Sequence, residues 1–119
     1  MPSRRPERVS GLLLETVAET LLREVKDPRV SAVTVTGVKM SPDLKTARIF
    51  FTIRQNEAVE DALAGLRKAT GFIKRQVADR LHLRYMPTIE FRYDETLEQV
   101  NRLESLLRQA AEKERERPN

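Results

Sequence analysis

Four cations lie close to a glycine that interrupts a helical pattern in the second half of the chain. Apolar residues recur at helical spacing both before and after Gly71. Because glycine is roughly 1 kcal/mol less favourable than alanine inside a helix, and can adopt backbone angles closed to other residues, we expect a kink between two helices there. The second helix would present unpaired backbone N–H groups and a positive dipole end to an anion. The cations beside this predicted anion site are Arg67, Lys68, Lys74 and Arg75.

The positive charge of the chain is concentrated in this region. The 119 residues include 22 Lys and Arg and 18 Asp and Glu, a net charge of +4. Residues 67–84 hold six cations and one acid, which gives +5 and leaves −1 for the rest of the chain. Cations clustered on a continuous surface favour contact with nucleic-acid phosphates, whereas a solvated helix face is the alternative interpretation. Arg80 and Arg84 complete the predicted phosphate-contact set.

Two further features suggest contact with nucleic acid. Arg4, Arg5 and Arg8 form a second basic group at the N-terminus, although short basic termini are common. Phe50 alternates with polar residues in a predicted strand, so its ring should lie on the outer face of a sheet, where it could stack on a base. A phenylalanine in this position is more often covered by a neighbouring helix or simply exposed.

The sequence lacks the residues that several classes of function require. There is no cysteine, and the single histidine, His82, has no convergent cluster of metal ligands around it in the sequence pattern. No phosphate-cradling Gly-rich loop or hydrolase motif is present, so we expect neither an enzyme nor a metal, cofactor or small-molecule substrate. No apolar run approaches the length of a membrane span, and the first eight residues lack a secretory signal, so we expect a cytoplasmic protein.

The first half of the chain predicts a helix followed by a hairpin. Residues 7–26 carry a broad apolar stripe at helical spacing, and Asp27-Pro28 should end that helix. Residues 31–40 and 46–54 alternate as strands do. The parity of the first strand switches after Gly37, which predicts a β-bulge at or beside it. Residues 41–44, Ser-Pro-Asp-Leu, predict a tight turn between the strands.

The second half predicts two helices, a strand and a last helix. The helices cover residues 57–68 and 71–82, the strand covers residues 88–93, and Asp94 is a candidate N-cap for the helix that follows. That helix should carry Leu97, Val100, Leu103 and Leu107 on one side. Residues 112–119 have no apolar face, so we expect a single domain over residues 1–111 and a disordered charged tail.

This order predicts an α+β fold in which helices cover one face of a three-stranded sheet. The expected core includes residues from the first helix and from all but the first strand. Its members are Leu13, Val17, Ile49, Phe51, Ile53 and Phe91.

The same order, with a break between two central helices, resembles a type II KH domain, a fold that binds single-stranded nucleic acid. Over residues 6–107 the resemblance narrows to the bacterial ribosome-binding factor A family. The motifs that carry it are Asp27-Pro28-Arg29, Thr34-Val35-Thr36, Ser41-Pro42-Asp43-Leu44, Ala69-Thr70-Gly71, Leu83-Arg84-Tyr85-Met86-Pro87, and Phe91 followed by Asp94. KH domains usually have Gly-x-x-Gly at the corner between the helices. Here Ala69-Thr70-Gly71 takes that place, so contacts known for Gly-x-x-Gly proteins are not transferred.

The resemblance implies a non-catalytic assembly factor of the small ribosomal subunit. Such a protein binds an immature 30S particle, contacts 16S ribosomal RNA, helps its 5′ end to mature and then leaves. It adds Ala69, Thr70 and Gly71 to the predicted RNA-binding residues, and it implies a monomer off the ribosome. A domain whose basic face binds an acidic protein partner is the alternative from another class.

Overall fold

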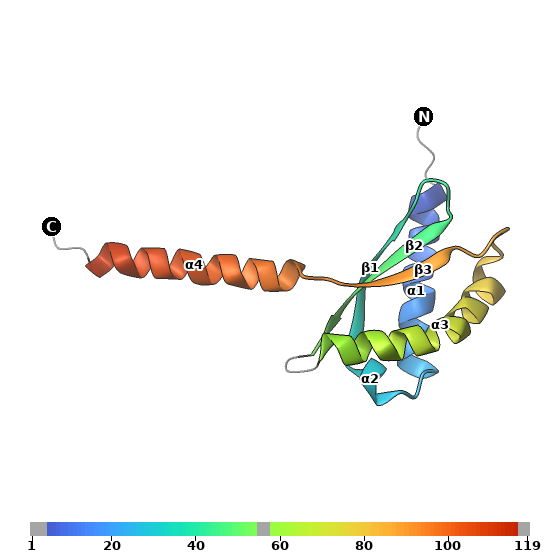
Figure 1. Ribbon diagram of the computed structural model, residues 1–119. Coiled ribbons are helices and arrows are strands. Elements are labelled where there is room, and N and C mark those ends of the chain that lie inside the picture. The colour runs from blue at the N-terminus through green and yellow to red at the C-terminus, as the bar shows by residue number, and fades with distance from the viewer. Residues whose placement is uncertain (1–4, 55–57, 117–119) are drawn as a thin grey trace.

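The sheet has the strand order β1-β2-β3, and its two pairings differ in direction. In the computed structural model, which describes residues 5–54 and 58–116, β1 is antiparallel to β2, whereas β3 is parallel to β2. The elements, coloured along the chain in Figure 1, are α1 (Arg5–Arg23), α2 (Pro28–Ser31), β1 (Val33–Met40), β2 (Thr46–Ile53), α3 (Val59–Leu81), β3 (Thr88–Tyr93) and α4 (Thr96–Glu116). The predicted α+β class with a three-stranded sheet is confirmed.

The β1–β2 hairpin has the features that its sequence predicts. The register shifts between Val35 and Gly37, which confirms the β-bulge. Asp43 holds the turn, because its Oδ1 accepts hydrogen bonds from Ser41 Oγ at 2.6 Å and from Lys45 N at 3.0 Å. Leu44 has a φ of 62°, a left-handed conformation that this tight turn requires. The bonds fix the turn between the strands.

One face of the sheet carries the core. Alternate β2 side chains are buried against α1 and α3, while Arg48 and Arg92 lie exposed on the other face. Of the six predicted core residues, four are fully buried and two, Ile53 and Phe91, are partly buried at the margin. The fully buried four are Leu13, Val17, Ile49 and Phe51. Because α1 and α3 also contact each other, they close this face.

The predicted break at Gly71 is wrong in its backbone detail. A single helix, α3, continues through the glycine, and no glycine of the described chain has a positive φ. Figure 1 shows that the axis of α3 nevertheless bends near its middle, where the colour passes from green to yellow. Good helix formers on both sides outweigh the unfavourable propensity of one glycine, so the corner is a bent helix and offers no new helix N-terminus.

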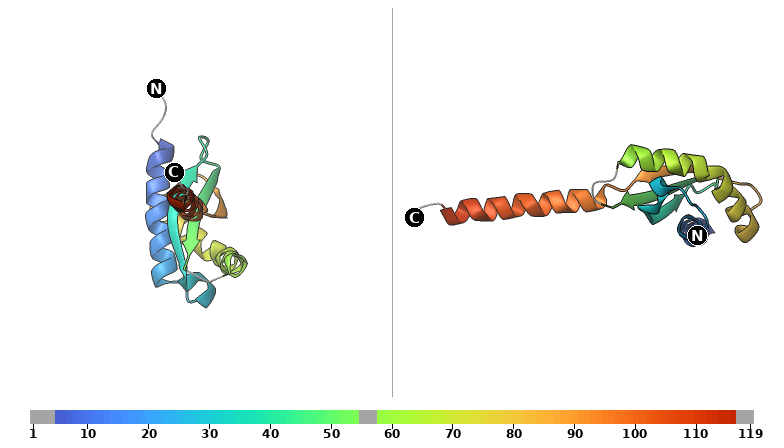
Figure 2. Two further views of the ribbon diagram at one scale, coloured as in Figure 1. Left: turned by 90° about the vertical axis from the view of Figure 1, so that its left-hand side faces the viewer. Right: turned by 90° about the horizontal axis from the view of Figure 1, so that it is seen from below.

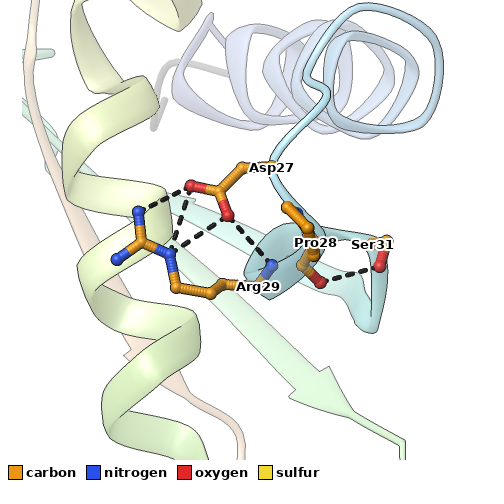
Figure 3. A network of polar contacts seen from close by, with 4 residues as sticks. All are labelled: Asp27, Pro28, Arg29 and Ser31. Carbon is orange, nitrogen blue, oxygen red and sulfur yellow. Dashed lines mark hydrogen bonds and ion pairs between the residues drawn. The ribbon is translucent and has the colours of Figure 1, made fainter.

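A short helix, α2, was not predicted; it follows the predicted helix stop at Asp27-Pro28 and ends at Ser31, where the first strand was expected to begin. Asp27 caps it by accepting a hydrogen bond from Arg29 N at 3.0 Å, and it forms an ion pair with Arg29 Nη2 at 2.7 Å (Figure 3). The Arg29 contacts lower the pKa of Asp27 from 3.8 to about 2, chiefly through the side-chain hydrogen bonds and then through the backbone one.

The packing of α2 against α3 requires a glycine at position 65 and not at position 71. α2 lies against α3 at Gly65, where a Cβ would stand 2.9 Å from Val30 Cγ2 and 3.1 Å from Arg29 Cβ. A Cβ at Gly71 would meet no protein atom of the described chain within 4 Å. Close approach of two elements therefore explains the first glycine, and no packing contact explains the second.

α4 does not pack on the sheet, contrary to expectation. Figures 1 and 2 show it projecting from the domain beyond the end of β3. Its side chains at Val100, Leu103, Leu106 and Leu107 are between 45% and 60% exposed. It also continues to Glu116, past residue 111, where disorder was expected to begin. Glu, Lys and Arg are good helix formers and can pair at i and i+4, so helix continues without an apolar face.

Three hydrogen bonds fix the start of α4. Asp94 accepts hydrogen bonds from Thr96 N at 3.0 Å and from Thr36 Oγ1 at 2.7 Å, and Tyr93 donates its hydroxyl proton to Glu98 at 2.7 Å. Asp94 was predicted as the N-cap, but it lies one residue before that position because α4 begins at Thr96. Its carboxylate still accepts a hydrogen bond from the first N–H of the helix. No helix in the described residues is long and apolar enough to cross a membrane.

Candidate nucleic-acid interface

The bend of α3 carries four cations arranged symmetrically about Gly71. Two lie four and three residues before the glycine, and two lie three and four residues after it. Side chains three and four residues apart are neighbours on a helix surface, so each of the four stands one turn from Gly71. We call these four residues the α3 cluster: Arg67, Lys68, Lys74 and Arg75.

The centre of the α3 cluster is open backbone. Gly71 is exposed and has no side chain, so a phosphate can approach the helix there more closely than at any residue with a Cβ. Phe72 lies beside it, half-buried, with the Arg75 guanidinium 5.8 Å from the centre of its ring. The arrangement offers positive charge, a close approach and an aromatic edge on one surface.

The charges of the α3 cluster are available. In the part of the chain that the structure describes, none of the four forms an ion pair with a carboxylate, although other exposed arginines do. Three are exposed and Lys74 is half-buried. Cations already paired with carboxylates would have to give up those partners before they could bind phosphate, and the α3 cluster has no such requirement.

A groove of about 520 Å³ runs beside the α3 cluster, between α3 and β3. Leu63, Arg67 and Thr70 line it from the helix, and residues 89–93 line it from the strand. β3 is an edge strand, because β2 is its single neighbour in the sheet. We call this feature the α3–β3 groove. Arg67 is the cation of its helix wall, and its strand wall presents Ile89, Phe91 and Tyr93 together with the charged Glu90 and Arg92. A groove that offers a cation and aromatic side chains suits a nucleic-acid strand, whose phosphates and bases need different partners.

The structure does not bring all of the predicted cations together. Arg80 lies on another side of α3 and pairs with Glu19 of α1, Nη1 to Oε2, at 2.9 Å, so it does not join the α3 cluster. Arg84 lies beyond the end of α3, and together with Arg5 it lines a different cavity. Arg8 is exposed on α1, and the prediction for Arg4 lies outside the described residues. Ala69 and Thr70 are half-buried, with the Thr70 hydroxyl donating to Leu66 O at 2.9 Å.

Phe50 lies on the outer sheet face, as its parity predicts. It is half-buried and stands between Gly37 of β1 and Arg92 of β3 in the register of the sheet. Because α4 projects, no described helix covers this face. A role in base stacking stays a prediction.

Two candidate residues were missed by the sequence reasoning. Phe72 follows Gly71 directly and precedes Arg75 by three residues, a spacing that could have signalled their contact on a helix. Arg92 lies in the part of β3 that borders the α3–β3 groove, with its side chain exposed on the outer sheet face, and its position depends on the parallel pairing of β3 with β2, which no local pattern indicates.

The described residues offer little for metal or acid–base chemistry. They contain no group of three or more His, Cys, Asp or Glu side chains that could hold a metal ion. His82 is exposed and ends α3 in a left-handed conformation, with a φ of 50°. Hydrogen bonds from Thr96 and Thr36 lower the pKa of Asp94, and the carboxylate of Glu98 raises the pKa of Tyr93. These shifts belong to structural contacts at the start of α4.

Comparison with known proteins places the chain in a family. A family model described as ribosome-binding factor A matches residues 5–107. The chain belongs to the ribosome-binding factor A family. A ribosome-binding factor A from Coxiella burnetii is 38% identical over 112 residues, covering 94% of each chain. A member from Syntrophus aciditrophicus is 44% identical over 105 residues, covering 87% of this chain and 85% of the relative.

Solved structures of the ribosome-binding factor A family share the fold. The crystal structure of ribosome-binding factor A from Thermus thermophilus aligns with a TM-score of 0.66 at 25% identity, over 74% of this chain and 94% of that one. A homology model of the Thermus thermophilus protein, fitted into a cryo-EM map of a 30S complex, aligns with a TM-score of 0.53 at 25% identity, over 71% and 93%. That neighbour is therefore described in complex with the 30S subunit.

Proposed function

We propose that this member of the ribosome-binding factor A family is a non-catalytic assembly factor that binds immature 30S subunits. In this proposal it contacts 16S ribosomal RNA and supports maturation of the 5′ end of that RNA. The α3 cluster binds phosphates, and the α3–β3 groove holds part of an RNA strand. Nucleases that process the RNA are separate proteins. Family membership and the 30S complex described for the Thermus thermophilus neighbour support this proposal.

The observation that carries the RNA-binding part is the placement of four available cations around exposed Gly71. A protein that neutralises phosphates releases their counterions, so its affinity falls as salt rises. If each cation of the α3 cluster contacts one phosphate, the plot of log affinity against log salt should have a slope of about −3 to −4.

The test is charge reversal of the α3 cluster to glutamate, with binding to purified 30S subunits measured over a salt series. The control variant reverses four exposed cations elsewhere, at Arg23, Lys26, Lys39 and Arg102, so that net charge changes equally. We expect the cluster variant to stay folded and lose most of its affinity, while the control keeps the salt slope. Equal loss in both variants would mean that net charge, and not this site, drives binding.

Two further measurements separate the remaining parts of the proposal. Binding that survives nuclease digestion of the subunit RNA would favour an acidic protein partner instead. For the 5′ end, cells that lack the gene can be complemented with either variant, and 16S precursors can be measured by primer extension. Accumulation of 5′-extended precursor with the cluster variant alone supports the maturation role, and equal processing in both strains contradicts it.

A further inference from the structure

A second cavity lies at the opposite end of α3 from its start, away from the α3–β3 groove. It has a volume of about 570 Å³, within the range of about 300–1,000 Å³ that is common for small-ligand sites. Three separate segments form it: the start of α1, the β1–β2 turn, and the connector between α3 and β3. We call it the connector cavity, and it is lined by Arg5, Asp43, Leu44, Lys45, Leu83, Arg84 and Tyr85.

The connector cavity combines positive charge with an exposed aromatic ring. Its lining contains three cations, one from each segment, against the single carboxylate of Asp43, which gives a local balance of +2. That carboxylate already accepts hydrogen bonds from Ser41 and from Lys45 N, so it is committed to the turn. Tyr85 is 73% exposed, and the Arg84 guanidinium lies 5.4 Å from the centre of its ring.

The walls of the cavity are held in place. Thr88 N donates a hydrogen bond to Lys45 O at 2.8 Å, which ties the connector to the turn. Pro87, the last residue of the connector, is fully buried, and the turn is fixed by its own hydrogen bonds. An exposed tyrosine on a segment anchored at its end is a poor candidate for a core residue and a good candidate for a stacking surface.

We propose that the connector cavity is a nucleotide subsite that takes one unstacked base of a single-stranded RNA segment. Tyr85 stacks on the base, and Lys45 and Arg84 bind its flanking phosphates. A duplex cannot place a base in such a site because its bases are already stacked and paired. This inference rests on the proposed function, and it adds a contact that discriminates between single-stranded and double-stranded RNA.

The test compares a labelled single-stranded RNA decamer with the blunt duplex of the same sequence, at one fixed salt concentration. Tyr85→Ala should weaken binding of the single strand by roughly 5- to 100-fold and change duplex binding by less than about twofold. Tyr85→Phe should restore binding because the ring is kept. Met86→Ala is the matched control, since Met86 is the exposed neighbour outside the cavity lining, and it should bind normally.

A spectroscopic measurement reports on the ring itself. The chain has two tyrosines and no tryptophan, so a Tyr93→Phe background leaves Tyr85 as the single tyrosine. Its fluorescence should be quenched by the single-stranded decamer and not by the duplex. Quenching by a polyglutamate peptide but not by RNA would overturn the proposal in favour of a protein partner.

The outcomes separate this inference from the proposed function. If Tyr85→Ala binds single strands normally while charge reversal of the α3 cluster abolishes binding, the subsite is overturned and the proposed function stands. If Tyr85→Ala weakens single-strand and duplex binding equally, the residue has no part in base recognition, and the inference is again overturned. If the unmodified protein binds neither RNA nor 30S subunits, both proposals are overturned.

Discussion

Replacing either of two glycines in α3 by alanine should change the free energy of unfolding, but in opposite directions. Gly65→Ala adds a Cβ 2.9 Å from Val30 Cγ2, and such overpacking typically destabilises by about 1–3 kcal/mol, partly offset by better helix propensity. Gly71→Ala adds a Cβ in open space, so it should raise the free energy of unfolding by about 0.5–1 kcal/mol. Urea denaturation followed by circular dichroism measures both.

Each glycine variant is the control for the other, because both changes occur in α3. Equal stabilisation by the two substitutions would mean that α2 can move away from residue 65 without any loss of folding stability. If Gly71→Ala is more stable yet binds 30S subunits more weakly, the glycine serves close approach of the ligand, as the geometry of the α3 cluster suggests.

Asp27 should make folding stability depend on acid pH. Its pKa is lowered from 3.8 to about 2 in the folded chain, chiefly by the side-chain hydrogen bonds from Arg29. A depressed pKa contributes stability that is fully present above the unfolded value, near 3.8, and is lost as pH falls through about 2. Thermal melting between pH 5 and pH 2 should therefore show Asp27→Asn less stable than the unmodified protein at pH 5.

The difference between these two proteins should shrink as the pH approaches 2. Asp43 and Asp94 also have lowered pKa values, so both proteins lose stability in acid, and the informative quantity is the difference between them. A difference that stays constant across this range would show that the carboxylate charge of Asp27 does not matter to the fold.

At the level of the elements, α4 should be dispensable for the stability of the domain. The described part of α4 shares no packed interface with another element, and Leu103, Leu106 and Leu107 are exposed. A chain that ends after Gln99 keeps the Thr36–Asp94 and Tyr93–Glu98 contacts and removes most of the helix. We expect its free energy of unfolding to change by less than about 0.5 kcal/mol, with a loss of helical signal. Destabilisation by more than about 1 kcal/mol would mean that α4 packs on the domain in solution.

Local patterns predicted the elements better than they predicted contacts between elements. The strand faces, the bulge beside Gly37 and the turn at residues 41–44 all follow from parity and turn chemistry, which act over a few residues. The break at Gly71 was wrong because one glycine was weighed without the helix formers around it. The amphipathic pattern of α4 identified an apolar stripe but could not say what, if anything, would cover it.

Within the candidate site too, features set by neighbouring residues could be predicted, and features set by residues far apart in the sequence could not. The α3 cluster could be predicted because its four members lie within nine residues of one helix. The pairing of Arg80 with Glu19 joins residues 61 positions apart, so the sequence could not remove Arg80 from the set. The walls of the α3–β3 groove likewise depend on where β3 joins the sheet. That the α3 cluster binds RNA stays a prediction.

The whole molecule should appear elongated in solution. Its radius of gyration is 18.8 Å and its longest dimension is 68 Å, whereas a compact domain of this length has a radius of gyration of about 13–14 Å. Small-angle X-ray scattering at low concentration should give a value near 19 Å for the full chain. The chain ended after Gln99 should fall close to the compact value. A compact full-length protein would contradict the projection of α4.

The parallel pairing of β3 also bears on the order in which the molecule folds and opens. The β1–β2 hairpin closes a short loop, whereas β3 pairs with β2 across a separation of 42 residues, as the Arg48–Glu90 contact illustrates. Loop-closure entropy delays such a pairing during folding. An edge strand with one neighbour is also a natural unit of sub-global opening, so amides of β3 should exchange with solvent before those of β2. The strand wall of the α3–β3 groove would then be the last part of the sheet to form and the first to loosen.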